Sequence, residues 1–301
     1  MFQALGDRVK HWITHNEPWC TAYLGYAEGI HAPGLKDFGL AVSATHHLLL
    51  SHAKAVARFR EMNQGGRIGI TLNLWPMYAA SDSPRDEAAV RTADGHYNRW
   101  FLDPVFKGAY PEDTLEQFRA KGFAPQIAPG DMDLLAKGGV DFLGVNYYMR
   151  HIVAHSDTAR FGFESRKPPK AQFTEMGWEV FPEGLHALLS RLDRDYGHPE
   201  LYVTENGIAC KDDRRVNGRV EDDDRIRYLR DHFIQAHRAI QSGVKLRGYF
   251  VWTLMDCFEW HDGFSMHFGL ASMDPKTLER KLKKSALWFR DVIRDDGFSV
   301  D

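Results

Sequence analysis

The sequence predicts an α/β protein built on a parallel sheet. Apolar runs with the spacing of strands alternate along the chain with segments whose apolar residues recur at helical spacing. This alternation places strands parallel, either in a barrel or in a doubly wound sheet. No glycine-rich phosphate loop follows any expected strand, which weighs against a dinucleotide-binding protein. We count five strand–helix units, find no linker or internal repeat, and expect one domain over residues 1–301.

The expected strands are rich in β-branched and aromatic residues. They cover residues 9–13, 68–74, 139–148, 201–204 and 245–256. The run 139–148 is almost continuously apolar, as in a strand buried on both faces, and we expect 9–13 to be a short buried strand as well. The expected helices contain residues 40–62, a stretch that begins at Pro84, and residues 185–192, 226–240 and 283–293.

Two glutamates follow expected strands in similar local sequences. Glu17 lies in "ITHNEP", where Pro18 cannot donate a hydrogen bond to a sheet and ends the strand. Glu205 lies in "YVTENG", where we expect Gly207 to supply the φ angle of a tight turn. Either glutamate alone is more simply an ordinary strand-end residue in water. Two of them predict a site, because α/β barrels hold their catalytic groups at the carboxyl ends of the strands.

The composition excludes several classes of protein. The chain has 301 residues, of which 44% are hydrophobic, and this is enough for one large core. A net charge of −3 gives no basic excess for nucleic acid. No apolar run approaches the length of a membrane span, and the first residues lack a secretory apolar segment. Three cysteines, far apart, predict a reducing compartment and a cytoplasmic location.

Two long connections follow expected strands, at residues 151–178 and 210–225. Both leave the carboxyl ends of strands, so we expect them to border the site, as long ordered loops often do. The alternative for residues 165–170, "SRKPPK", is a merely mobile segment.

Seven segments of the chain resemble segments of glycoside hydrolase family 1 and occur in the order in which that family has them. They are "ITHNEP", "GYAEGIHAPG", "GVNYY", "GWEVFPEGL", "YVTENG", "WTLMDCFEW" and "GFSMHFGL". The family holds retaining β-glucosidases and their relatives on a (β/α)8 (TIM) barrel. The resemblance implies a single partial barrel domain with about five βα units, corresponding to strands 4–8. The first three units would be missing, together with a Gln and a His that the family uses near the sugar 3-hydroxyl.

The resemblance also implies roles for the residues at the carboxyl ends of the strands. Glu17 corresponds to the general acid/base and Glu205 to the nucleophile. Retaining hydrolysis needs two carboxyls about 5–5.5 Å apart, and their like charge predicts a raised pKa for the acid of the pair. By the same resemblance Asn16 would bind the 2-hydroxyl, Tyr148 would hold Glu205, and Asn146 would support the site. The alternative for Asn146 and Tyr148 is a strand-end polar residue satisfied by the backbone.

The segment "WTLMDCFEW" resembles the part of the family that recognises the sugar. Trp252 would lie under the sugar ring, Glu259 would accept from the 4- and 6-hydroxyls, and Trp260 would donate to the 3-hydroxyl. Because the Glu259 carboxylate would repel a phosphate dianion, we expect an unphosphorylated sugar. Trp178 resembles the platform for the leaving group, and a core tryptophan is the alternative.

A few residues depart from the family pattern. Cys257 stands where Asn is usual, and His15 and His267 also replace more common residues. The other histidines that raise the question of a metal are His11, His46, His47 and His52. None of these histidines or cysteines has zinc-site spacing, so we predict neither a metal nor a cofactor.

The expected substrate is a small-molecule β-glycoside or oligosaccharide, with the choice among glucose, galactose and fucose left open. We expect an N-terminal barrel segment in trans, or self-association, to complete the open barrel. Two alternatives are a catalytically idle fragment that binds sugar, and an inverting hydrolase or transglycosylase on the same scaffold. We expect no nucleic-acid or membrane partner.

Overall fold

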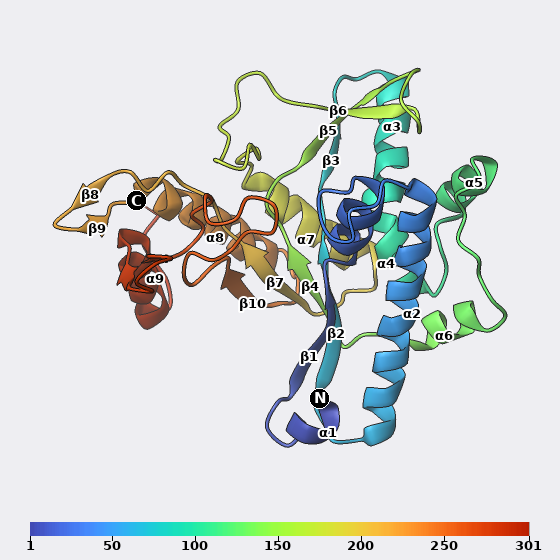
Figure 1. Cartoon of the computed structure of the whole chain (residues 1–301), viewed down its shortest axis with the longest axis horizontal. Coiled ribbons are helices and arrows are strands. Elements are labelled where there is room, and N and C mark those ends of the chain that lie inside the picture. The colour runs from blue at the N-terminus through green and yellow to red at the C-terminus, as the bar shows by residue number, and fades with distance from the viewer. Residues whose placement is uncertain (301) are drawn as a thin grey trace.

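The computed structural model describes residues 1–300 and contains a central parallel sheet of five strands (Figure 1). The strand order is β1-β2-β4-β7-β10, and every neighbouring pair is parallel. The strands are β1 His11–Asn16, β2 Arg67–Asn73, β4 Phe142–Asn146, β7 Leu201–Asn206 and β10 Leu246–Val251. The α/β class and the five parallel strands predicted from the sequence are confirmed.

Helices connect these strands, and each helix expected from the sequence is present. The long ones are α2 Phe38–Met62, α3 Pro84–Asp94, α7 Glu183–Asp195, α8 Asp223–Gln241 and α9 Lys284–Asp295. Shorter helices are α1 Phe2–Leu5, α4 Trp100–Lys107, α5 Glu112–Ala120 and α6 Asp131–Lys137, and two π-helical segments are η1 Cys20–Ala27 and η2 Gly95–Arg99. The start of α2 is capped by the Asp37 carboxylate, which accepts from the Leu40 N–H at 3.0 Å.

The main core lies on the side of the sheet covered by α2, α4 and α7. The central strands β2 and β4 are buried almost throughout, and Leu72, Val145 and Val203 pack into one cluster with Trp100 and Phe118. The apolar side chains of these strands therefore pack against the apolar faces of the helices, as the sequence pattern predicts. This rigid layer fixes the positions of the strand ends that carry the site.

The sheet does not close into a barrel within residues 1–300. The strands β1 and β10 stand at its two edges. Ile13 of β1 has 45% of its surface exposed and Phe250 of β10 has 58%. The expectation of a short buried strand at 9–13 was wrong: the strand runs from His11 to Asn16 and is only half covered, because β2 is its single neighbour in the sheet.

The long connections contain small sheets that the sequence did not predict. The first carries β5 His151–His155 and β6 Phe163–Arg166, which join β3 Met77–Ala79 in a three-stranded sheet. The second connection forms the hairpin of β8 Arg215–Val216 and β9 Arg219–Val220. A further small pair, β11 Ala271–Met273 with β12 Arg280–Leu282, lies after β10 and outside both connections. Among residues 1–300, no helix is both long and apolar enough to cross a membrane.

Candidate active site

The predicted site residues surround one cavity at the carboxyl edge of the parallel sheet. Its volume is about 480 Å³. All nine predicted residues line it: Asn16, Glu17, Asn146, Tyr148, Trp178, Glu205, Trp252, Glu259 and Trp260. They come together because β1, β4, β7 and β10 are parallel and therefore end on the same side.

Glu17 is held at the end of β1 by an unusual backbone conformation. Its φ angle is +47°, in the left-handed region, which costs a residue with a side chain about 1–2 kcal/mol. The Glu17 N–H donates to the Thr71 carbonyl of β2 at 3.0 Å, and Pro18 follows as a buried residue. These constraints turn the chain sharply at the carboxylate, a local cost of the kind that functional sites often carry.

Both oxygens of the Glu17 carboxylate accept hydrogen bonds. Asn146 donates its amide N–H to Oε1 at 2.8 Å, and the Cys20 thiol donates to Oε2 at 3.0 Å. Burial, followed by the charge of Glu17, raises the pKa of the Cys20 thiol well above its ordinary value. Cys20 therefore remains an S–H donor at neutral pH. The sequence analysis did not identify Cys20 as a site residue, although its position about one helical turn after Glu17 could have indicated the contact.

Glu205 lies at the end of β7 and shares its surroundings with Glu17. Tyr148 donates its hydroxyl to Glu205 Oε2 at 2.9 Å. Burial, and then the negative charge of Glu17, raise the pKa of Glu205 to about 7, while hydrogen bonds from Tyr148, Asn16 and Asn146 act in the opposite direction. The sequence predicted a raised pKa on the other carboxyl of the pair. In this structure burial and the nearby charge of Glu17 raise the pKa of Glu205.

Asn146 connects the two glutamates. Its amide nitrogen donates to Glu17 and, at 3.0 Å, to the Asn16 side-chain oxygen, while its own side-chain oxygen accepts from the Thr204 hydroxyl at 2.6 Å. These partners are side chains, so the alternative of a strand-end residue satisfied by the backbone does not describe Asn146. For Tyr148 the same alternative fails, because its hydroxyl donates to Glu205.

Gly207 is required for a reason other than the predicted one. Its φ angle is not positive, and a Cβ atom at this position would lie 1.9 Å from the Trp252 carbonyl oxygen. The residue is therefore needed for the close approach of β7 and the end of β10, which the sequence around Gly207 does not reveal.

The predicted sugar-recognition residues Trp252, Glu259 and Trp260 also line this cavity. Trp252 donates its indole N–H to Glu259 Oε1 at 3.2 Å, and burial raises the pKa of Glu259. Trp260 has 80% of its surface exposed. Trp178 lies 5.0 Å from the Tyr148 ring and lines the cavity, so it is not a simple core tryptophan.

Aromatic and histidine side chains complete the cavity wall in places that the sequence analysis did not identify. Among them are Trp19, His31, Trp75, Tyr97 and His151. Trp75 lies two residues after the end of β2, in "LNLWP", so its place near the carboxyl end of a strand could have indicated it. Trp19 and His31 come from the segment between β1 and α2, Tyr97 from η2 and His151 from β5, and no local pattern indicated that these segments meet at the cavity.

The chain belongs to glycosyl hydrolase family 1, because the model of that family matches residues 1–298. It is 44% identical over 300 residues to Beta-glucosidase A from Acetivibrio thermocellus, an alignment that covers 99% of this chain and 67% of that protein. Beta-glucosidase A from Thermotoga maritima is 43% identical, with 99% and 66% covered. The structure of a Thermotoga maritima beta-glucosidase in complex with deoxynojirimycin matches with a TM-score of 0.94 at 42% identity, again over 99% and 66%. The chain thus spans about two thirds of the length of these relatives.

Proposed function

We propose that this chain carries the catalytic site of a retaining β-glycosidase of the β-glucosidase type, which hydrolyses unphosphorylated β-D-glycosides by double displacement. The observation that carries the proposal is a pair of carboxyls, Glu17 and Glu205, at the carboxyl edge of one parallel sheet and linked through Asn146. Relatives with the names of β-glucosidases, one of them bound to deoxynojirimycin, support a sugar substrate.

The first displacement breaks the glycosidic bond. Glu205, ionised, attacks the anomeric carbon and forms an ester to the sugar, while Glu17, protonated, gives its proton to the leaving oxygen. The aglycone departs as an alcohol, and Glu17 is left ionised. This step needs Glu17 protonated and Glu205 ionised when the substrate is bound, and the hydroxyl of Tyr148 favours the second condition because it donates to the Glu205 carboxylate.

The second displacement regenerates the enzyme. Glu17 takes a proton from water, the water oxygen attacks the anomeric carbon, and the ester to Glu205 breaks. Two inversions give net retention of configuration. Asn16 binds the 2-hydroxyl, where a hydrogen bond tightens in the transition state, and Glu259 accepts from the hydroxyls at the far side of the ring. A carboxylate at Glu259 disfavours phosphorylated sugars because the two negative charges repel each other.

We further propose that full activity requires the sheet edges to be covered. The apolar side chains of Ile13 and Phe250 are exposed on β1 and β10, which end the sheet in the described chain. An N-terminal segment with three further βα units, or a second copy of the chain, would pair with these edges. Three free cysteines fit the reducing, cytoplasmic compartment that the sequence predicts.

The test is hydrolysis of an aryl β-glucoside by the purified chain, alone and mixed with a polypeptide that carries three further βα units. Turnover that is abolished by Glu205→Ala and unchanged by Glu61→Gln, a replacement on the surface, supports the catalytic pair. Proton NMR of the first product distinguishes the mechanisms, since retention gives the β-anomer and inversion the α-anomer. A folded complex that binds deoxynojirimycin and shows no turnover would favour the sugar-binding, catalytically idle alternative.

A further inference from the structure

A buried ionic cluster lies at the base of the loop that carries Glu259 and Trp260, and its members do not line the active-site cavity. Lys283 is completely buried, and its ammonium group contacts the carboxylates of Asp256, at 2.9 Å, and Asp212. Arg225 is buried as well. It contacts Asp222 and donates to the main-chain carbonyl of His267 at 2.6 Å.

This cluster joins the two loops that carry the proposed chemistry. Asp212 belongs to the loop that follows Glu205, and Asp256 belongs to the loop that carries Glu259. Since Lys283 bonds both aspartates, one buried cation ties the nucleophile side of the site to the sugar-recognition side. A buried ion pair between residues far apart in the sequence keeps their segments in place, because separating the two groups leaves a buried charge without a partner.

Asp256 also fixes the shape of its own loop. Its Oδ1 accepts from the Gly269 N–H at 2.8 Å, and so connects the outgoing and the returning arms of the loop. Burial opposes ionisation of Asp256, but His267 and Lys283 outweigh it and lower the pKa of this carboxyl. Asp256 is therefore ionised at neutral pH, and the loop that it joins to Gly269 carries Glu259 and Trp260.

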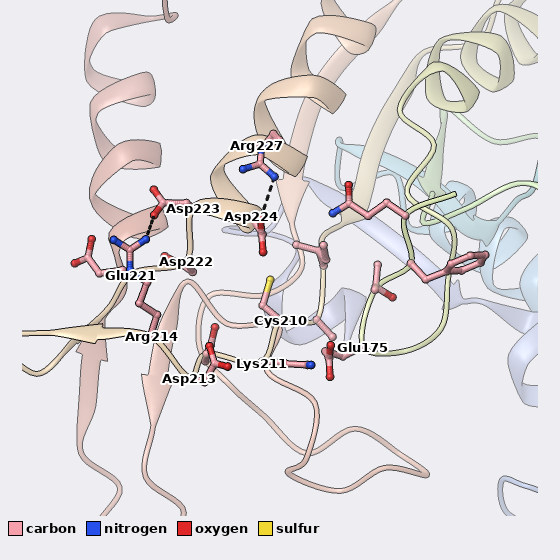
Figure 2. A pocket seen from close by; sticks show the side chains of 16 residues that line it. Glu175, Cys210, Lys211, Asp213, Arg214, Glu221, Asp222, Asp223, Asp224 and Arg227 are labelled. Atoms are coloured by element: carbon pink, nitrogen blue, oxygen red, sulfur yellow. Dashed lines mark hydrogen bonds and ion pairs between the residues drawn. The ribbon is translucent and has the colours of Figure 1, made fainter. Parts of the chain in front are cut away.

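The cluster does not require a metal ion. Ligand atoms of Asp212, Asp256 and His267 lie within 4.8 Å of one another, a spacing that a metal could use. However, Lys283 already contacts both aspartates and supplies the positive charge. A neighbouring hollow of about 560 Å³ has several acidic side chains in its lining, and some of their charge is balanced by ion pairs such as Arg227 with Asp224 (Figure 2).

We propose that Asp256, held by the buried Lys283, is a positioning residue that sets Glu259 against the sugar. The inference rests on the proposed glycosidase function and deepens it, because it assigns part of the sugar selectivity to a contact outside the cavity. Asp256 itself does not line the cavity, so it acts through the loop rather than on the substrate.

The test compares Asp256→Asn with wild type on two substrates, under the condition in which wild type turns over. Asparagine preserves the shape and the acceptor for Gly269 but removes the charge that Lys283 holds. We expect kcat/KM to fall about tenfold for an aryl β-glucoside and less than about threefold for an aryl β-xyloside, which lacks the 6-hydroxymethyl group that Glu259 would contact. Lys284→Met is the matched control, because the adjacent Lys284 pairs with Asp223 at the surface, and we expect no change there.

A double variant gives a readout that a merely structural role would not produce. If Asp256 acts through Glu259, adding Asp256→Asn to Glu259→Gln causes no further loss on the glucoside. Equal losses on both substrates, or losses that multiply in the double variant, would overturn the positioning role while leaving the proposed function intact. Absence of turnover by wild type, alone and complemented, would instead overturn the proposed function, and this inference with it.

Discussion

Replacing Glu205 by Gln tests whether this carboxyl, the proposed nucleophile, reduces the stability of the fold at neutral pH. Burial of Glu205 and the charge of Glu17 raise its pKa from 4.5 to about 7, a difference in free energy of about 3 kcal/mol between the two protonation states. Because the folded state binds this proton more tightly than the unfolded state, the contribution of Glu205 to stability is most favourable below pH 4.5. It declines as the pH rises through 7.

Glutamine carries no charge at any pH, so the variant lacks this decline. We expect the free energy of unfolding of Glu205→Gln to exceed that of wild type by under about 1 kcal/mol at pH 5 and by about 3 kcal/mol at pH 8. Other titrating groups cancel in the difference, apart from Glu17, whose charge is one cause of the raised pKa.

Urea denaturation followed by tryptophan fluorescence measures this difference at pH 5, 6, 7 and 8. Glu61→Gln serves as the control, because the Glu61 side chain is 64% exposed and its replacement should change stability by less than about 0.5 kcal/mol at every pH. A difference between Glu205→Gln and wild type that does not vary with pH would refute the reasoning. So would a variant that is less stable than wild type at pH 8.

Three further replacements test other parts of the structure. Tyr148→Phe removes the hydroxyl donor 2.9 Å from Glu205 and should lower kcat about 10–100-fold. The acidic limb of the pH–rate profile should move to higher pH, because ionised Glu205 loses a hydrogen bond, and an unmoved limb would contradict a role for this contact. Gly207→Ala places a methyl group 1.9 Å from the Trp252 carbonyl oxygen and should lower the free energy of unfolding by about 1–3 kcal/mol in thermal denaturation. Gly139→Ala is the control, because its added methyl group meets no atom within 4 Å and should leave the stability nearly unchanged. Phe250→Lys charges an exposed edge strand and should decrease self-association in light scattering, and equal association of both proteins would argue against pairing at this edge.

The position of the site could be predicted because it depends on few properties of the chain. Strand-like runs around "ITHNEP" and "YVTENG" predict strand ends, and parallel strands bring their carboxyl ends to one edge. The resemblance to a family then supplied the seven other residues that line the same cavity. No knowledge of loop structure was needed for either step.

What the sequence did not predict depends on contacts between distant segments. The raised pKa on Glu205 depends on how deeply the strand end is buried and on the charge of Glu17, and neither is visible in a local pattern. The need for Gly207 depends on the path of the chain at Trp252. Lys283 and Asp256 lie in segments that look like an ordinary helix start and a strand end, so their pairing emerged only in three dimensions.

The same residues explain why local sequence rules fail mainly around the site. Glu17 has a backbone conformation that favours glycine, and Glu205 is a carboxyl in surroundings that oppose its charge. Each of these features is unfavourable for folding, yet each follows from bringing two carboxyls together in a partly buried cavity, as glycosidic cleavage requires. The rigid layer of β2, β4 and α2 and the buried Lys283 cluster stabilise the strand ends and loops on which these residues lie. The stable elements of the fold therefore hold the two glutamates in an unfavourable geometry, and Glu205→Gln should gain stability where it loses activity.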